Sequence, residues 1–439
     1  MLVLKFGGTS VGTSQRMKDV SALITNDGET KFVVLSAMSG TTNSLVEISD
    51  YLHKKNPEGA LAIIRELEKK YMSHVQELYS TDEYREKTTD FLKQEFQYLR
   101  SFTKMHFTSF EEKVILAQGE IMSTNMVCNY MQECGIKTIL LPALDIIRTD
   151  KNSEPDMHYI SEHTQKALED NPGYQIYMTQ GFICRNAYGE IDNLLRGGSD
   201  YTACLIGSAI QAGEIQIWTD IDGMHNNDPR YVEGTEPVRQ LHFAEAAELA
   251  YFGAKILHPT CIQPARFAGV PVRLKNTMDP TAPGTIINNE FREGKIKAVA
   301  ARDGNTCIKI NSSRMLLAYG FLRKVFEIFE TYRTSIDMIC TSEVGVSLTI
   351  DNTARLYDIE NELKKYGRVT VEQNMCIICV VGDLRPQNNG FETIATDALK
   401  DIPVRMISYG GSNHNISFVV KEEDKVRTMQ ALQKTLFNS

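Results

Sequence analysis

The feature that most constrains this chain is a repeated succession of short β-rich runs, polar turns and helical patterns. Such runs cover residues 2–6, 32–35 and 215–218, and each ends in a turn rich in glycine, serine, threonine or aspartate. Strands that alternate with helices are typical of an α/β fold with a parallel sheet. Open α/β sheets bind ligands at the carboxyl ends of their strands, where these turns lie. The pattern predicts an α/β domain with a site at one sheet edge.

Longer patterns indicate where helices and domains lie. Apolar residues recur at three- and four-residue steps through 61–78, which predicts an amphipathic helix. A second helix is expected over Phe243 to Leu257, before His258-Pro259. A proline-rich stretch follows, after which the helix–strand rhythm changes, and we place the main boundary near residue 295. The chain of 439 residues is long enough for about three domains.

The last third of the chain contains a weak internal repeat. Gly320-Phe321 followed by Met338-Ile339 returns about 70 residues later as Gly390-Phe391 followed by Met406-Ile407. The strand-like segment after each copy also matches. Two small βαββαβ units explain this pattern, and a coincidence between two generic α+β stretches is the alternative.

Composition excludes several classes of function. With 47 Lys+Arg against 56 Asp+Glu, the net charge is −9, and no basic block suits nucleic acid. No apolar run approaches the roughly 20 residues that cross a bilayer, and the N-terminus lacks the pattern of a signal peptide. Nine cysteines without a signal favour reduced thiols in the cytoplasm. Cys376 and Cys379 lie in an apolar run, which predicts a buried strand rather than a zinc or redox site.

The first polar turn carries a lysine before two glycines and two hydroxyls. In Lys5-Phe6-Gly7-Gly8-Thr9-Ser10, the glycines let backbone N–H groups approach phosphate, and Lys5 can neutralise charge between the β- and γ-phosphates. The segment is neither a Walker A loop nor Gly-x-Gly-x-x-Gly. An ordinary glycine turn is the alternative.

Two further segments carry charges that would suit an amino acid. Arg196-Gly197-Gly198-Ser199-Asp200 opens a helical stretch, where Ser199 or Asp200 is either the N-cap or part of an anion site. Glu120 is expected near a helix start, where it would serve the helix dipole or receive an ammonium group. An arginine and a glutamate facing one another would fit the two charges of an α-amino acid.

The segment 219–230 is too polar and turn-rich for the core, so we expect a surface loop at a strand end. A calcium loop is disfavoured because it lacks the closing glutamate.

Together these segments resemble the monofunctional aspartate kinases of the lysine-sensitive type, in the amino-acid kinase superfamily, which carry C-terminal ACT domains. The resemblance covers essentially the whole chain. It rests on the motifs at residues 5–11, 181–183, 196–203, 218–220, 252–259 and 341–344. It implies an α/β fold: a three-layer αβα sandwich over 1–294, then ferredoxin-like (βαββαβ) ACT domains over 295–373 and 374–439. Whether the ACT units are interlaced is left open.

The resemblance also implies an activity. Family members transfer the ATP γ-phosphoryl group to the β-carboxylate of L-aspartate and form 4-phospho-L-aspartate, the first step towards lysine, threonine and methionine. ATP and Mg²⁺ are the implied cofactors, with the metal held mainly by ATP and no protein metal ligands assigned. The implied catalytic residues are Lys5 and Asp200. The implied aspartate-binding residues are Ser36, Thr42, Glu120, Arg196 and Ser199. The implied ATP-binding residues are Lys5, Gly7, Gly8, Ser10, Thr219, Asp220, Arg230 and Lys255.

The C-terminal third resembles the regulatory part of these enzymes, which implies inhibition by L-lysine and a homodimer through the ACT domains. The implied effector residues are Met315, Gly320, Phe321, Leu322, Ile336, Asp337, Thr341, Ser342 and Glu343. Two positions depart from the family: Ala318 replaces a common serine and His225 replaces a common tyrosine. Threonine, or no effector, therefore stays open, as does a purely dimerising role. Another acceptor, such as glutamate or N-acetylglutamate, and a sensor without catalysis are the competing functions.

Overall fold

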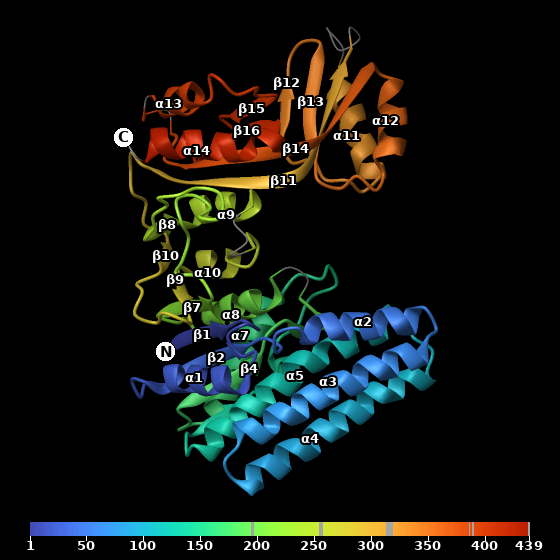
Figure 1. Cartoon of the computed structure of the whole chain (residues 1–439), viewed down its shortest axis with the longest axis vertical. Coiled ribbons are helices and arrows are strands. Elements are labelled where there is room, and N and C mark those ends of the chain that lie inside the picture. Colours follow the sequence, from blue (N-terminus) through green and yellow to red (C-terminus); the bar gives the residue numbers. More distant parts are fainter. Residues whose placement is uncertain (195–196, 254–257, 313–318, 386, 389, 438–439) are drawn as a thin grey trace. The chain divides into compact units, whose positions relative to one another are not determined.

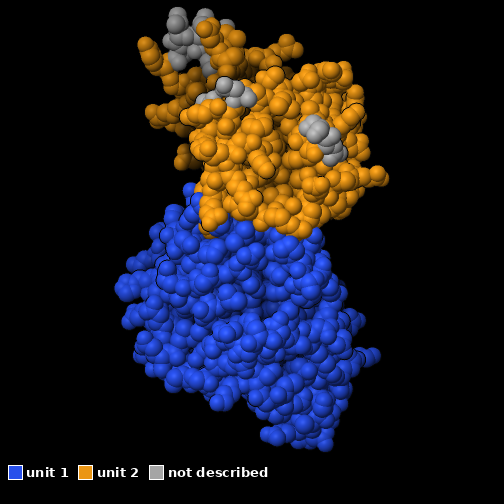
Figure 2. Space-filling view, turned by 90° about the vertical axis from the view of Figure 1, so that its left-hand side faces the viewer, with its two compact units in different colours: residues 1–224, 257–289 blue, residues 225–256, 290–439 orange. Residues whose placement is uncertain are grey.

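The computed structural model describes residues 1–194, 197–253, 258–312, 319–385, 387–388 and 390–437. The chain forms two compact units, each built from two stretches of sequence (Figure 2). The first comprises residues 1–224 and 257–289, and the second comprises residues 225–256 and 290–439. These units are defined by contacts within the chain. The domain limits expected at 294 and 373 stay predictions.

The first unit is a mostly parallel sheet between helical layers (Figure 1). Its strands follow the order β3-β4-β2-β1-β7-β9-β10, and only β10 is antiparallel to its neighbour. These strands are β1 (Leu2–Phe6), β2 (Lys31–Leu35), β3 (Thr138–Leu140), β4 (Ile176–Gln180), β7 (Glu214–Thr219), β9 (Val272–Asn276) and β10 (Thr285–Asn288). A separate hairpin consists of β5 (Ile183–Arg185) and β6 (Ile191–Asn193). The helices are α1 (Ser14–Thr25), α2 (Thr41–His53), α3 (Pro57–Leu78), α4 (Asp82–Ser101), η1 (Phe102–Lys104), α5 (Ser109–Glu133), α6 (Ala143–Ile146), α7 (Met157–Asp170), α8 (Gly198–Ala209) and α10 (Gln263–Ala268).

Alternating side chains of the central strands are buried on both faces of this sheet. Leu4 and Leu35 join the apolar core formed with α1 to α5, whereas Val3 and Val34, on the opposite face, are also fully buried. Helix α8 packs against β1, β2 and β7, and α7 and α10 pack against α8. Strands buried on both faces are typical of a parallel sheet covered by helices. This arrangement is the three-layer sandwich that was expected.

The expected strands and the helix of 61–78 are confirmed by β1, β2, β7 and α3. The helix expected over 243–257 is wrong in its extent, because α9 ends at Tyr251. Gly253 follows with a φ of +118°, a conformation that an L-residue with a side chain rarely adopts. The backbone therefore leaves the helix before the end of the alanine-rich run.

The second unit combines α9 with a six-stranded antiparallel sheet in the order β12-β13-β11-β14-β16-β15 (Figure 1). The strands of this sheet are β11 (Ile296–Asn311), β12 (Ile339–Thr341), β13 (Gly345–Ile350), β14 (Arg368–Gly382), β15 (Met406–Tyr409) and β16 (Asn415–Lys421). The unit also contains β8 (Gln240–His242), which is not part of this sheet. Its helices are α9 (Phe243–Tyr251), α11 (Phe321–Thr331), α12 (Leu356–Lys364), α13 (Phe391–Ala398), η3 (Glu422–Asp424) and α14 (Lys425–Leu436).

The internal repeat corresponds to two βαββαβ units, as expected. Gly320 precedes α11 and Gly390 precedes α13, and both glycines have positive φ. The matching segments form β12 and β15, followed by β13 and β16. The two βαββαβ repeats share their longest strands, β11 and β14. The second half of β11 pairs with β13 of the first repeat, and the second half of β14 pairs with β16 of the second repeat. Cys376 and Cys379 lie buried in β14, which confirms the predicted buried strand.

Candidate active site

The polar turns of the first unit meet at one edge of its sheet. β1 pairs in parallel with β2 and with β7, and Phe6 lies level with both Leu35 and Trp218. The segments that begin at Gly7, at Ser36 and at Thr219–Asp220 therefore leave the sheet side by side. The carboxyl edge of a parallel sheet is the usual place for a ligand, and the sequence prediction of this site is consistent with the geometry.

Lys5 and Asp200 form an ion pair at this edge. The Nζ of Lys5, on β1, lies 2.7 Å from Oδ1 of Asp200, in the first turn of α8, and their side chains are 12% and 15% exposed. A Cβ on Gly7 would lie 3.5 Å from the same Nζ, so the ammonium stands directly over the glycine turn. A fixed, largely desolvated cation in this position can stabilise negative charge on a transferring group.

The glycine turn packs tightly against the loop after β2. The carbonyl of Gly8 accepts a hydrogen bond from the Ser39 N–H at 3.1 Å, and a Cβ on Gly8 would lie 2.7 Å from the Ala37 carbonyl oxygen. The turn leads into α1, whose first turn is capped by Thr13. The hydroxyl of Ser10 is buried against Thr277 Oγ1 at 2.8 Å, so its engagement there competes with the predicted contact to phosphate.

Glu120 lies in the middle of α5, so its expected place near a helix start is wrong. The helix begins eleven residues earlier, at Ser109, where Thr108 and Glu111 form a capping box. Gly119, the residue before Glu120, allows a close approach inside the helix. A Cβ on Gly119 would lie 2.9 Å from the Cβ of Ala37. The glycine thus lets the loop after β2 reach α5.

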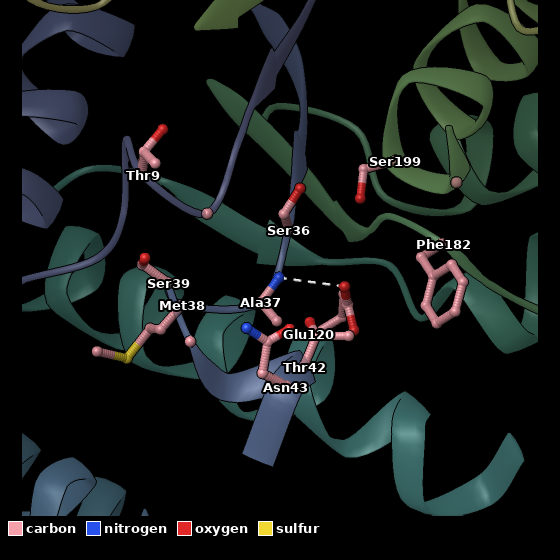
Figure 3. Close-up of a pocket in the computed structure, with 13 residues that line it drawn as sticks. Thr9, Ser36, Ala37, Met38, Ser39, Thr42, Asn43, Glu120, Phe182 and Ser199 are labelled. Atoms are coloured by element: carbon pink, nitrogen blue, oxygen red, sulfur yellow. Dashed lines mark hydrogen bonds between the residues drawn. The ribbon is translucent and has the colours of Figure 1, made fainter. Parts of the chain in front are cut away.

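The carboxylate of Glu120 is buried and only partly satisfied. Its side chain is 4% exposed, and Oε1 accepts a hydrogen bond from the Ala37 N–H at 3.2 Å (Figure 3). The other oxygen, Oε2, is buried and makes no hydrogen bond within the described part of the chain. Burial raises the pKa of Glu120 from 4.5 to about 8. A nearby cation would stabilise the ionised form of this carboxyl group, because its charge replaces the hydration that burial removed.

A cavity of about 430 Å³ opens beside Glu120 and brings several predicted residues together. Ser36, Thr42, Glu120 and Ser199 all line it, and Figure 3 shows them around one space with the Phe182 ring at its side. Its full lining is Gly8, Thr9, Ser36, Ala37, Met38, Ser39, Gly40, Thr42, Asn43, Glu120, Phe182, Gly198 and Ser199. Hydroxyls, a carboxylate and a helix N-terminus together suit a small zwitterion.

Helix α8 closes this cavity with its first turn. Gly197, with a φ of +64°, is the N-cap, so of the two alternatives for Ser199 and Asp200 the N-cap role is wrong. Both residues lie inside the helix, where their backbone N–H groups belong to the first turn. A Cβ on Gly198 would collide with Phe182, which itself has a positive φ of 69°. Arg196 lies outside the described residues.

The predicted nucleotide residues are distributed over both units. Thr219 donates a hydrogen bond to Asp220 Oδ1 at 3.0 Å at the end of β7. Arg230 belongs to the second unit and pairs with Asp228 at 2.6 Å. Lys255 lies outside the described residues. His225, the departure from the family, contacts Thr235 Oγ1 through Nδ1 at 3.1 Å.

The predicted effector residues surround the start of β12 and α11. Asp337 has a side chain that is 2% exposed and is paired with Arg302. Phe321 is buried in the core of the first βαββαβ unit and Leu322 is partly exposed. Thr341, Ser342 and Glu343 are exposed at the end of β12. Gly320 and Ile336 lie next to these elements, and Met315 lies outside the described residues.

Sequence reasoning missed the residues that shape the cavity without carrying charge. The Ala37 N–H orients Glu120, Gly119 admits the loop, and Phe182 forms a wall. The glycine inside an otherwise regular helical pattern was the available signal for Gly119. Backbone groups such as the Ala37 N–H leave no such signal.

Among the described residues, no group of three or more histidine, cysteine, aspartate or glutamate side chains has the arrangement of a metal site. No helix of that part of the chain is long and apolar enough to cross a membrane.

Comparison with known proteins agrees with this geometry. Residues 1–276 match the model of the amino acid kinase family, and residues 378–436 match an ACT domain model. The lysine-sensitive aspartokinase 3 of Escherichia coli K12 is 32% identical over 449 aligned residues, which cover 100% of this chain and 99% of the relative.

Two solved structures of E. coli aspartokinase III are also similar over their whole length. The complex with aspartate and ADP, in the R-state, has a TM-score of 0.85 at 31% identity, with 100% of both chains covered. The complex with lysine and aspartate, in the T-state, has a TM-score of 0.81 at 32% identity and covers 100% of this chain and 99% of that chain. The fold, the full-length identity and the family match together establish that this chain belongs to the amino acid kinase family and, within it, to the aspartokinases.

Proposed function

We propose that this chain transfers the γ-phosphoryl group of ATP to the β-carboxylate of L-aspartate. The buried, half-satisfied carboxylate of Glu120 carries the proposal, because a free amino acid supplies the ammonium that it lacks. A similar enzyme, E. coli aspartokinase III, has been solved with aspartate and ADP, which supports the same substrates here. The product would be 4-phospho-L-aspartate, the entry to lysine, threonine and methionine synthesis.

Different residues of the cavity would bind different groups of the substrate. Glu120 would hold the ammonium group, and Arg196, by family resemblance, would hold the α-carboxylate. The hydroxyls of Ser36, Thr42 and Ser199 line the same cavity and would orient the remaining oxygens. The β-carboxylate would then point towards Lys5. An acceptor carboxylate is already nucleophilic, so positioning takes the place of a general base.

Lys5 and Asp200 would act on the transferring group. The Lys5 ammonium would stabilise charge that develops on the phosphoryl oxygens, and Asp200, at 2.7 Å, would keep it in place. The remaining nucleotide contacts are proposed for Gly7, Gly8, Ser10, Thr219, Asp220, Arg230 and Lys255. ATP would arrive as its Mg²⁺ complex, and the metal would supply positive charge that offsets part of the charge of the phosphates.

Regulation by L-lysine and a homodimer through the ACT domains complete the proposal. The aspartokinase 3 of E. coli K12, a relative similar over the whole chain, is named as lysine-sensitive. The two βαββαβ units would supply the regulatory surface. A cytoplasmic location is proposed because none of the nine cysteines, all of which the structure describes, forms a disulfide.

The test is release of ADP from Mg-ATP with L-aspartate, L-glutamate or N-acetyl-L-glutamate, each alone, with L-lysine and with L-threonine. Turnover on aspartate alone, suppressed by lysine, supports the acceptor and the effector together. Turnover on another acceptor would reject aspartate while keeping the family. Turnover on aspartate that neither lysine nor threonine reduces would reject the effector and favour ACT domains that only dimerise.

A further inference from the structure

The carboxylate of Asp337, which the family resemblance assigns to the effector, is already occupied by two side chains of the same chain. Arg302, on β11, places Nη2 2.8 Å from Asp337 Oδ2. Tyr251, the last residue of α9, donates its hydroxyl to Asp337 Oδ1 at 2.8 Å. Both carboxylate oxygens therefore have a partner without any effector.

These contacts also cover the carboxylate. The Asp337 side chain is 2% exposed, and the Arg302 guanidinium that covers it is 19% exposed. The guanidinium lies 5.1 Å from the centre of the Tyr251 ring, so a cation–π contact joins the two partners. A ligand ammonium cannot reach Asp337 while this arrangement persists.

Asp337 itself is held in place by its backbone. Its N–H donates to the Thr349 carbonyl at 2.9 Å, beside the pairing of β12 with β13. Because this hydrogen bond fixes the backbone of Asp337 just before β12, a competing ammonium has to displace the side chains around its carboxylate.

The guanidinium of Arg302 has other acceptors besides Asp337. Its Nη1 lies 3.9 Å from Asp351 Oδ2, whose side chain is half-exposed, and its Nη2 donates to Asn305 Oδ1 at 3.2 Å. A displaced guanidinium can keep these acceptors, which lowers the cost of giving up Asp337. Without these acceptors the same cation would be left largely buried and unpaired, which is strongly unfavourable.

Tyr251 connects this carboxylate to α9. The chain continues from Tyr251 to Gly253, where a Cβ would collide with the carbonyl oxygen of Ala301, the residue before Arg302. The end of α9 is thus packed directly on β11 beside the effector carboxylate. Two residues later the chain reaches Lys255, which is proposed for nucleotide binding.

We propose that Arg302 and Tyr251 occupy Asp337 in the effector-free chain, and that the effector ammonium displaces Arg302 and thereby releases Tyr251 at the end of α9. The inference rests on the proposed regulation by lysine and adds two residues to it: Arg302 as an internal competitor and Tyr251 as the group that transmits binding. Lysine and Arg302 carry the same charge on flexible stems, so the two compete for one acceptor.

The test is titration of the full-length chain with L-lysine by calorimetry, in parallel with inhibition of ADP release. Removing the competitor in Arg302→Gln should lower the dissociation constant for lysine about tenfold or more, because the ligand no longer displaces a paired cation. Arg302→Lys, which keeps the charge, should bind lysine more nearly as the unaltered chain does. Arg323→Gln removes an exposed cation of α11 that pairs with Glu327 and should change nothing.

Tyr251→Phe tests transmission without changing any charge. It should bind lysine at least as tightly as the unaltered chain, yet lose less activity when saturated with lysine. Full inhibition of this variant would overturn the role of Tyr251. Unchanged or weaker lysine binding by Arg302→Gln, while the unaltered chain binds lysine, would overturn the competition.

The experiment distinguishes a failure of the proposed regulation by lysine from a failure of the competition and of the catalytic proposal. If neither the unaltered chain nor Arg302→Gln binds lysine, lysine is not the effector and the competition falls with it. Binding by Arg302→Gln alone would support the competition, since the internal cation would then exclude the ligand completely. Turnover on aspartate, measured in the same samples, reports the catalytic proposal in every case.

Discussion

At the scale of single residues, the ionisation of Glu120 controls substrate binding. Its pKa is raised to about 8 by burial, so the free protein holds a proton on this carboxyl below that pH. Binding an ammonium requires the carboxylate, and aspartate binding therefore releases a proton. We expect the dissociation constant for aspartate to fall about tenfold between about pH 6 and about pH 7. Calorimetry in buffers of different ionisation enthalpy measures both the affinity and the released proton.

Glu120→Gln is the control for this pH dependence. The amide cannot ionise, so the variant should bind aspartate more weakly and with an affinity that does not change over this range. An unaltered chain whose aspartate affinity is flat between about pH 6 and about pH 7 would show that Glu120 is already ionised before binding.

Lys5 provides a second prediction at this scale. Lys5→Ala removes the cation that Asp200 holds at the sheet edge, and kcat should fall on the order of 10²- to 10³-fold. Folding should change little, because Asp200 stays near the N-terminus of α8. Steady-state ADP release and a thermal melt measure both effects. Lys113→Ala removes a comparable pair with Asp192 and should keep normal turnover, and a normal kcat in Lys5→Ala would exclude Lys5 from catalysis.

At the scale of elements, a buried amide contact fastens α14 to the segment before Arg230. Asn227 donates to Gln433 Oε1 at 3.2 Å and to the Met429 carbonyl at 3.1 Å, and both amide side chains are 2% exposed. Gln433→Leu leaves a buried donor unpaired, so stability should fall by about 1–3 kcal/mol. Gln430→Leu, on the more exposed face, should cost less than about 0.5 kcal/mol. Differential scanning calorimetry measures the melting temperatures of the unaltered chain, Gln433→Leu and Gln430→Leu. Equal melting temperatures would contradict a stabilising role of the Asn227–Gln433 contact.

The same scale shows what the sequence could predict. The strands at 2–6, 32–35 and 215–218 are rich in valine, isoleucine, leucine and aromatic residues, and their ends lie side by side at the sheet edge where the site is predicted. Glu120 is misplaced by the sequence prediction because the helix begins at Ser109 rather than near Glu120, and Gly119 inside this helix makes room for Ala37. The early end of α9 depends on contact between Gly253 and β11, two segments far apart in the chain. Long-range packing of this kind has no local pattern.

At the scale of the regulatory unit, the two βαββαβ repeats are physically continuous. The first half of β11 pairs with the second half of β14, over Ile296 to Arg302 against Gly382 to Ile377. The second half of β11 pairs with the first half of β14. A bulge near Asn305 and the positive φ of Asn374 mark the passage between these halves. The second repeat therefore takes its fourth strand, the first half of β11, from the sequence of the first repeat, whereas the strands of the first repeat lie in its own sequence.

This sharing predicts how the unit responds to truncation. A chain that ends at residue 373 keeps all of β11 but loses the second half of β14, so Val299 and its buried neighbours lose their partner strand. An unpaired apolar strand exposes backbone groups and tends to aggregate. We expect residues 296–302 of the truncated chain to be cleaved rapidly by protease, whereas α11, β13 and α12, whose apolar core is kept whole by the truncation, resist, as do residues 1–224. Mass spectrometry of the digest identifies the cleaved region. A protease-resistant fragment that includes residues 296–302 would show that the first half of β11 stays ordered without its partner strand.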